Sequence, residues 1–488
     1  MSPLLHEKLP LSDRAGRQTA AAEAVQAARA AFAGWKELSF RQRAVHLEKV
    51  RRLLTRRADA VARVVSEENG KPLTEVLGAE ILGSAEMLRV LLREGGAWIA
   101  PRTIPCRLSD RLRGVRHVRL LYEPMGVIGI IGTWNYPLLI NLRQIASALL
   151  CGNAVVWKPS EHSPRTAAVV EEIFREAGLP AGVFTVLPAQ RQAGVDLVSA
   201  GCEKIVFTGH AATGRRILKE LADKGIPSIM ELSGMDAALV CEDADLEKAV
   251  RGLCWASMTN AGQSCVAPRR LIVRREIVPA FRSAFAEAVR SLKVGDPLDP
   301  ETEIGPLRTL EQAKQLEELI RDAVSKGAEL VAGGRWREAA GKPFFEPTVL
   351  TGLNETMAIV QEEFFGPVSL LYAARDDREL TVLANAGPYG LGASIWTMDL
   401  RRAERLAGAV HAGIVWINEA LVSAGNARYP FGGTKQSGFG RVGGAEGMRQ
   451  LMNVKCLEIS GPGGFRPYYF PYSREKVKQL FQIIRWRG

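Results

Sequence analysis

The feature that most constrains the fold is an alternation of short apolar runs and helical segments between residues 126 and 225. The apolar runs cover residues 126–132, 153–159, 184–188 and 204–209, and helical patterning follows in residues 145–150, 166–178 and 213–225. Strands that alternate with helices in this way form a parallel sheet with helices on both faces. We therefore expect a doubly wound α/β domain.

The remainder of the chain supplies further elements. A length of 488 residues exceeds what one hydrophobic core supports and predicts two or three domains. The first hundred residues have helical patterning, and Ser39 with Gln42 forms a capping box. Residues 111–123 alternate as an exposed β-ribbon does, a pattern that often pairs with another subunit. A second α/β region is expected from about residue 236 to residue 440.

The charge and cysteine patterns argue against several classes of protein. The formal net charge is +11, but the arginines are scattered over alanine-rich helical segments without a nucleic-acid-binding motif. The seven cysteines are widely spaced and include no C-x-x-C pair, so we expect neither disulfides nor a metal site. The N-terminus lacks the apolar core of a signal peptide, and the apolar stretch 127–140 is too short to span a bilayer. We expect a cytoplasmic protein.

Residues 461–488 form a basic tail after the strand-rich part of the chain. Four apolar side chains fall on one face of a predicted helix and three cations flank that face: Val477, Leu480, Phe481 and Ile484, with Lys476, Lys478 and Arg485. We expect this amphipathic helix to pack on its own or a neighbouring subunit in preference to a membrane surface.

Two strand ends offer groups for a dinucleotide. Gly209 and Gly214 lie where a strand turns into a helix, and the free amides at the start of that helix suit a pyrophosphate. The two glycines have the spacing of a nucleoside-triphosphatase loop, but Arg215 and Arg216 stand where that loop needs Lys and Ser/Thr. The sequence therefore argues against a nucleoside triphosphatase. After another strand, Lys158 offers positive charge and Glu161 offers acceptors for a ribose diol. A carboxylate at that place repels a 2′-phosphate, which favours NAD, with NADP as the alternative.

Cys265 ends the stretch NAGQSC and raises the question of a nucleophile. Taken alone, a cysteine is more often a small buried hydrophobe. Seven motifs in one order change this interpretation: TWNYP (133–137), WKPSE (157–161), FTG (207–209) with Gly214, MELSG (230–234), NAGQSC (260–265), EEFFGP (362–367) and PFGGTKQSGFGR (430–441). From about residue 20 to residue 460, the chain resembles the aldehyde dehydrogenase superfamily.

The resemblance implies a subunit of three parts. These are an NAD-binding domain of residues 1–103 and 125–232, a catalytic domain of residues 233–445, and an oligomerisation ribbon of residues 104–124 and 446–460. The ribbon implies a homodimer or homotetramer. Residues 461–488 stay outside this scheme as the basic amphipathic tail.

The resemblance also implies roles for individual residues. Cys265 is expected to be the nucleophile, Glu231 the general base, and Asn135 a donor to the oxyanion. The residues expected around the cofactor are Thr133, Trp134, Lys158, Glu161, Gly209, His210, Gly214, Glu363 and Phe365.

The chemistry of aldehyde oxidation explains these residue types. A thiolate adds to the aldehyde and gives a tetrahedral thiohemiacetal, from which hydride leaves for the nicotinamide. Donors aimed at the oxyanion lower this barrier. Water then cleaves the resulting thioester, and Glu231 is suited to activate it if burial raises its pKa. The chain is thus expected to oxidise an aldehyde to the carboxylic acid.

The chain departs from the family pattern at two places. His210 and Ala211 follow F-T-G where small hydroxyl residues are usual, and Ser233-Gly234-Met235 replaces Gly-Gly-Lys after the base and its leucine. These departures bear on cofactor contacts and on deacylation. Three alternatives are a CoA-acylating member of the superfamily, a non-catalytic ligand-binding or structural protein, and a cysteine hydrolase.

The sequence leaves the substrate open. Side chains near Asn135, Cys265 and residues 419–431 are expected to line the aldehyde channel, and they mix apolar and small groups with Arg428. Both an aliphatic aldehyde and a semialdehyde with a carboxylate fit this composition. The amphipathic tail is similar to that of fatty-aldehyde members, which favours an apolar substrate.

Overall fold

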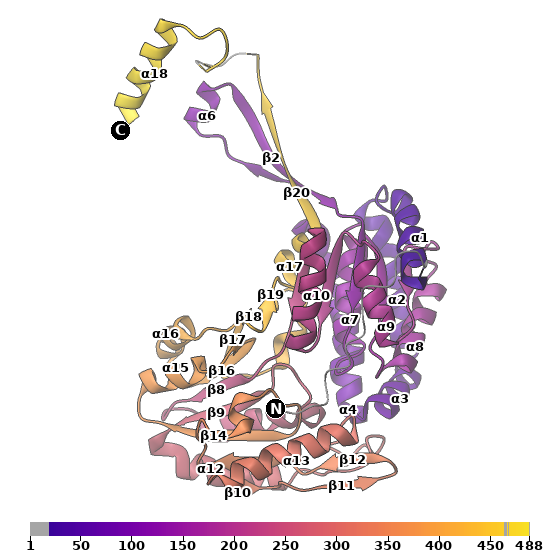
Figure 1. The fold of residues 1–488 in the computed structure, drawn as a ribbon, viewed down its shortest axis with the longest axis vertical. Helices are drawn as coiled ribbons and strands as arrows, with labels where there is room; N and C mark the ends of the chain where they lie inside the picture. Colours follow the sequence, from indigo (N-terminus) through magenta and orange to yellow (C-terminus); the bar gives the residue numbers. More distant parts are fainter. Residues whose placement is uncertain (1–18, 463–465, 467, 488) are drawn as a thin grey trace.

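Two helix-covered sheets form the body of the molecule, and a third, smaller sheet projects from it (Figure 1). The structure, a computed structural model, describes residues 19–462, 466 and 468–487. Residues 1–18 of the expected first domain and residues 463–465, 467 and 488 of the tail lie outside the described residues. In the described part, no helix combines the length and apolar character that a bilayer crossing needs.

The first sheet contains the strands expected from the alternating pattern. Its order is β19-β7-β6-β3-β4-β5, with all strands parallel except β19. The bounds are β3 (Val127–Ile131), β4 (Ala154–Lys158), β5 (Phe184–Val186), β6 (Lys204–Thr208), β7 (Ser228–Glu231) and β19 (Gly438–Phe439). Every side chain of β3, β4 and β6 is buried, as expected for a parallel sheet covered on both faces.

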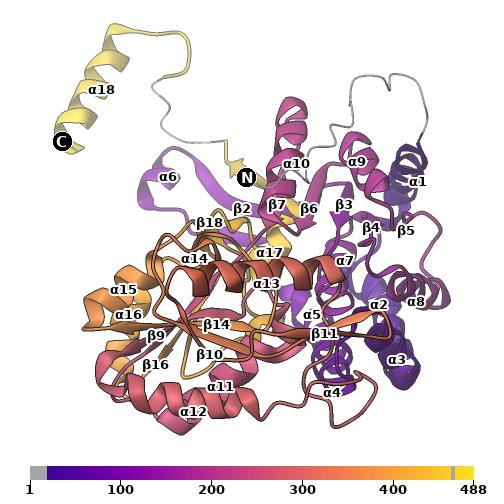
Figure 2. The same ribbon diagram turned by 60° about the horizontal axis from the view of Figure 1, so that its bottom comes forward.

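Helices cover both faces of this sheet (Figures 1 and 2). One face shares its core with α2 (Phe40–Arg56), α3 (Ala58–Asn69), α5 (Gly83–Trp98), α7 (Leu139–Leu150) and α8 (Pro164–Glu176). The other face packs against α1 (Ala20–Trp35), α9 (Arg191–Ser199) and α10 (Ala211–Lys224). The prediction of a doubly wound α/β fold is confirmed. The predicted capping box of Ser39 and Gln42 begins α2.

The second sheet has the order β10-β13-β14-β9-β8-β16-β17, and only β10 is antiparallel to its neighbour. Its strands are β8 (Asp236–Val240), β9 (Pro268–Arg274), β10 (Glu329–Ala332), β13 (Thr348–Thr351), β14 (Val368–Ala374), β16 (Gly392–Trp396) and β17 (Ile414–Ile417). One face packs against α11 (Leu246–Met258), α12 (Val278–Arg290) and α13 (Leu310–Ser325), the other against α15 (Asp377–Asn385) and α16 (Leu400–Ala409). Shorter elements lie elsewhere in the body: α4 (Leu73–Glu75), η1 (Val76–Leu82), β11 (Trp336–Ala339), β12 (Lys342–Phe345), α14 (Ala358–Gln361), β15 (Tyr389–Gly390), β18 (Thr434–Lys435) and α17 (Gly444–Gln450).

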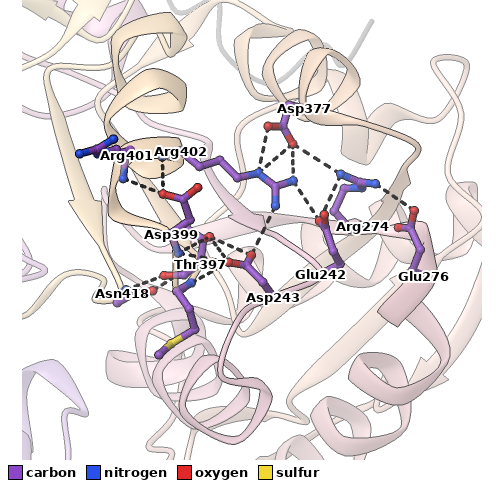
Figure 3. A network of polar contacts seen from close by, with 11 residues as sticks. Glu242, Asp243, Arg274, Glu276, Asp377, Thr397, Asp399, Arg401, Arg402 and Asn418 are labelled. Carbon is purple, nitrogen blue, oxygen red and sulfur yellow. Dashed lines mark hydrogen bonds and ion pairs between the residues drawn. The ribbon is translucent and has the colours of Figure 1, made fainter.

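A polar network ties the carboxyl ends of β8 and β9 to α15 and α16 (Figure 3). Arg402 of α16 donates through Nε to both carboxylate oxygens of Asp377, at 3.1 and 2.9 Å, and pairs with Glu242 at 2.9 Å. Arg274 at the end of β9 pairs with the same Glu242 at 3.1 Å. The network therefore stabilises the carboxyl end of β9, which is the end farther from Cys265 along the chain.

The projecting ribbon consists of β1 (Arg102–Ile104), β2 (Val115–Pro124) and β20 (Met452–Ser460), all antiparallel. Residues 111 and 112, expected in the ribbon strand, instead end the short helix α6 (Leu108–Leu112). The reason is local, because the Asp110 carboxylate accepts the backbone N–H of Arg107 at 2.8 Å and favours a helical turn. Beyond the ribbon lies α18 (Arg474–Arg487), which stands apart from the body (Figure 1).

Candidate active site

A cleft lies where the carboxyl ends of β3, β6 and β7 meet α13 and the loop before β9. Ligands of open α/β sheets bind at this edge. Nine of the twelve residues expected in the site line the cleft: Thr133, Trp134, Asn135, Gly209, His210, Glu231, Cys265, Glu363 and Phe365. No cluster of His, Cys, Asp or Glu in the described residues is arranged to hold a metal ion.

Cys265 follows α11 on a loop with unusual backbone geometry. Asn260 and Ala261 have φ angles of 54° and 52°, in the left-handed region that non-glycine residues rarely adopt. At Gly262 a Cβ would lie 2.0 Å from the carbonyl oxygen of Gly366, so glycine is required there. This tight turn presents the thiol to the cleft.

The buried guanidinium of Arg269 holds this loop. It donates to the carbonyl oxygens of Gly262 at 3.3 Å, Ser264 at 2.8 Å and Gly234 at 3.1 Å. Arg269 thereby connects the loop of Cys265 to the segment that follows Glu231. The sequence does not reveal this role of Arg269, because nothing local in the sequence shows that its side chain turns inward.

Asn135 is oriented by its neighbours. The Thr133 hydroxyl donates to Asn135 Oδ1 at 2.8 Å, so the amide nitrogen faces the other way and donates to the carbonyl oxygen of Gln263 at 3.1 Å. The side chain of Asn260 donates to the carbonyl oxygens of Asn135 at 3.0 Å and Gln263 at 3.2 Å. The segment of Asn135 and the loop of Cys265 are therefore joined directly.

A buried ion pair supports the start of α7, which follows Asn135. Lys71 Nζ lies 2.6 Å from Glu80, and both side chains are fully buried. The other oxygen of Glu80 accepts the backbone N–H groups of Leu138 at 3.1 Å and Leu139 at 2.8 Å. A carboxylate is favoured at a helix N-terminus, where amides lack partners. This support is not visible in the sequence, because Lys71 and Glu80 lie far from Asn135 in the chain.

Glu231 ends β7 as a fully buried carboxyl group. Burial raises the pKa of Glu231, while the positive charge of Arg143 and the nearby Thr208 hydroxyl oppose that rise. Burial, and then the charge of Glu231, raises the pKa of the Cys265 thiol. The two groups thus favour a single negative charge between them.

The two departures from the family pattern have structural roles. His210 is the N-cap of α10, and its Nδ1 accepts the N–H of Ala212 at 3.2 Å. The Ser233 hydroxyl accepts the N–H of Ala211 at 3.0 Å, which ties α10 to the segment after Glu231. Gly234 keeps the family glycine, since a Cβ there would lie 2.3 Å from the carbonyl oxygen of Cys265.

The cleft carries acceptors suited to ribose. Glu363 Oε1 accepts the N–H of Gly234 at 3.3 Å. The other oxygen, Oε2, is buried and has no hydrogen-bond partner among the described residues. It lies 3.4 Å from Nε2 of His210. A buried acceptor without a partner is costly, and a ribose hydroxyl would satisfy it. These residues fit a dinucleotide cofactor.

Three of the expected cofactor residues lie outside the cleft lining. Lys158 ends β4 and lies 3.3 Å from Glu161, whose other oxygen is 2.7 Å from Nε of Arg191. Gly214 lies in α10, where a Cβ would fall 2.5 Å from Leu232. Gly214 thus permits close packing of α10 on the end of β7.

Two arginines near the expected aldehyde channel lie in places that the sequence did not predict. Arg428, which the sequence analysis placed there, forms an ion pair with Glu94 at the surface. Arg143 of α7 is buried instead; it donates to the carbonyl oxygen of Ala424 at 2.9 Å and lies 5.3 Å from the ring of Phe431. A buried cation thus sits between Glu231 and the segment 419–431. The sequence does not reveal this position, because the burial of Arg143 depends on packing partners that are distant in the chain.

These features agree with the family that a comparison of the chain identifies. The chain belongs to the aldehyde dehydrogenase family, whose model, described as "Aldehyde dehydrogenase family", matches residues 3–457. It is an enzyme that oxidises an aldehyde to the acid with NAD or NADP as hydride acceptor, as predicted. The alternatives of a non-catalytic protein and of a cysteine hydrolase are set aside.

Several characterised proteins are similar over nearly their whole length. The succinate-semialdehyde dehydrogenase [NADP(+)] of Deinococcus radiodurans is 36% identical over 89% of this chain and 89% of its own. The human mitochondrial succinate-semialdehyde dehydrogenase is 36% identical over 90% of this chain and 81% of its own. A solved E. coli NADP-dependent enzyme superposes with a TM-score of 0.85 at 34% identity, covering 90% of each chain. The NAD⁺ complex of the Bacillus cereus aldehyde dehydrogenase gives 0.83 at 33% identity, covering 90% and 88%.

Proposed function

We propose that Cys265 is the nucleophile, Glu231 the base and Asn135 an oxyanion donor in this oxidation. The observation that carries the proposal is their convergence on one cleft around a buried carboxyl group whose pKa is raised. The thiolate form of Cys265 adds through sulfur to the aldehyde carbon, and the C=O π electrons move to the carbonyl oxygen, which becomes an oxyanion that the amide of Asn135 stabilises. The bound NAD(P)⁺ supplies the hydride acceptor, and Glu231 then takes a proton from the water that cleaves the thioester.

For the substrate we propose a short semialdehyde with a carboxylate, of the succinic semialdehyde type. The buried guanidinium of Arg143 supports this, because no carboxylate of the described residues forms an ion pair with it and its Nε has no hydrogen-bond partner. Burial lowers the pKa of Arg143, while the charges of Glu231 and Cys265 oppose that change without an ion pair to the guanidinium. A substrate carboxylate would supply a paired counter-ion, as a bidentate partner of the guanidinium. The names of the relatives agree with this class.

For the cofactor we propose that both NAD and NADP are accepted. Glu161 was expected to repel a 2′-phosphate, yet it lies between Lys158 and Arg191 and leaves a net positive charge at that place. Burial opposes ionisation of Glu161, but the hydrogen bond from Arg191 and the charge of Lys158 lower its pKa to about 2. The Arg191 side chain is 82% exposed, and such exposed pairs are weak. Arg191 can therefore leave Glu161 for a phosphate.

The proposed assembly and compartment follow from the ribbon and the thiols. The exposed strands of β1, β2 and β20 support a homodimer or homotetramer in which the ribbon contacts a neighbouring subunit. All seven cysteines lie in described residues and carry free thiols, which supports the reducing cytoplasm. Fusion of the chain to a fluorescent protein in its host, with fractionation of the cells, tests the compartment.

Rapid-mixing kinetics with NAD and an aldehyde tests the catalytic assignment. We expect Cys265→Ala to give no NADH, and Glu231→Gln to give one burst of up to one NADH per subunit followed by slow turnover. Cys106→Ala, which removes another partly exposed thiol, should turn over normally. A normal steady-state rate for Glu231→Gln would remove it as the base, and turnover only in the presence of CoA would establish the CoA-acylating alternative.

A further inference from the structure

The C-terminal tail exposes an unusual amount of apolar surface. Four side chains before α18 and three on it are between 49% and 80% exposed: Tyr468, Tyr469, Phe470, Tyr472, Val477, Phe481 and Ile484. In both views the helix stands apart from the body, beyond the end of the ribbon (Figures 1 and 2). The packing on its own subunit that the sequence analysis allowed is therefore not seen for these side chains. Contiguous apolar surface of this kind marks an interaction site.

The aromatic segment 468–472 and α18 form one unit. Lys476 Nζ donates to the carbonyl oxygens of Tyr469 at 2.7 Å and Pro471 at 2.9 Å, which folds the segment back onto the first turn of the helix. Arg466 Nε donates to the carbonyl oxygen of Arg113 at 3.2 Å, which fixes the unit to the turn between α6 and β2. Hydrogen bonds thus give the tail a defined structure at the tip of the ribbon.

The helix is amphipathic in a particular way. At 100° per residue, Val477, Phe481 and Ile484 lie within one narrow arc. Cations occupy both borders of that arc: Arg474, Lys478 and Arg485 on one side, and Lys476 on the other. Helices with an apolar face bordered by Lys and Arg lie in the plane of a membrane surface, where the long side chains reach the headgroups.

Charge decides between a membrane and a second copy of the chain. Residues 461–488 contain six Lys and Arg residues and a single acidic one, Glu475. The whole chain carries a formal charge of +11, so a second copy brings the same net excess of positive charge to this cationic tail. An anionic lipid surface attracts it instead, and the tyrosines and phenylalanines suit the headgroup region. We propose that the tail attaches the enzyme reversibly to membranes rich in anionic lipid.

Sedimentation with vesicles tests this proposal on the full-length enzyme. Vesicles of phosphatidylcholine and phosphatidylglycerol in equal parts should sediment the protein, and vesicles of phosphatidylcholine alone should sediment about tenfold less or none. The double variant Phe481→Glu/Ile484→Glu and the triple variant Arg474→Gln/Lys478→Gln/Arg485→Gln should each reduce binding about tenfold, and added salt should weaken it. NADH production should be unchanged in both variants.

Matched variants on the body provide the controls. Leu82→Glu/Val382→Glu removes two side chains of similar exposure, 59% and 60%, and should leave vesicle binding intact. The molar mass of each variant is measured in parallel by light scattering. The proposal is overturned if the wild-type enzyme ignores anionic vesicles, if it binds both lipid compositions equally, or if the tail variants change the oligomeric state instead of vesicle binding.

Discussion

The side-chain amide of Asn135 donates to the carbonyl oxygen of Gln263, two residues before Cys265, at 3.1 Å. This contact joins the segment after β3 to the loop before β9, and so joins the first sheet to the second across the cleft. The amide is directed by the Thr133 hydroxyl on its oxygen side. It therefore lies beside the loop of the thiol with its donor already oriented, which is what stabilisation of an oxyanion requires.

Replacement of Asn135 by alanine should lower kcat by about 10²- to 10³-fold, because one oriented donor is lost at the transition state. The KM for the aldehyde should change much less. Steady-state NADH production measures both. Thr133→Val provides a comparison, since it keeps the amide but removes the hydroxyl that orients it, and a smaller loss of kcat is expected. If Asn135→Ala raises KM by the same factor by which it lowers kcat, Asn135 serves only to hold the loop.

Replacement of Arg143 by methionine should separate the two classes of substrate. For succinic semialdehyde we expect KM to rise about 10- to 100-fold, the amount that a charged hydrogen-bonded pair contributes. For hexanal, which has no carboxylate, KM should stay the same or fall. The hexanal rate also reports any damage from losing the bond to Ala424. A preference of the wild-type enzyme for hexanal would favour the apolar substrate considered from the sequence.

Arg191→Ala tests the second cofactor. Without Arg191, only Lys158 offsets the charge of Glu161 beside the 2′-phosphate. The Kd for NADP should therefore rise about tenfold, while the Kd for NAD changes little. Quenching of tryptophan fluorescence measures both constants without turnover. Arg216→Ala removes an exposed arginine on α10 and serves as the control. Equal changes for both cofactors would show that Arg191 does not contact the 2′-phosphate.

The sequence predicted the first sheet well because its strands are short, apolar and separated by clear helices. It also placed Cys265, Glu231 and Asn135, since ordered motifs carry that information; the structure brings them to one cleft, and their roles await the kinetic experiments. Arg143, Arg269 and the Lys71–Glu80 pair escaped prediction for a common reason. Their importance depends on burial and on partners distant in sequence, and neither is visible in a local pattern.

The network of Arg402 gives a prediction about acid stability. Hydrogen bonding and charge from Arg402 lower the pKa of Asp377 and of Glu242 below their ordinary values of 3.8 and 4.5. Groups with a lowered pKa stabilise the fold above their ordinary pKa, and this stabilisation is lost as the pH falls through the lowered value. The wild-type enzyme should therefore lose stability through these groups as the pH falls below their ordinary pKa values.

Arg402→Met should remove about 1–2 kcal/mol at neutral pH, a figure reduced because Asp377 and Glu242 are 41% and 38% exposed. The difference from wild type should shrink toward acidic pH, because protonated carboxyls no longer need the guanidinium. Urea unfolding followed by fluorescence at several pH values measures this. Arg401→Met is a close control, since Arg401 contributes its backbone N–H to Asp399 and its side chain points away from the network (Figure 3). If both variants lose the same stability at every pH, the network does not act through charge.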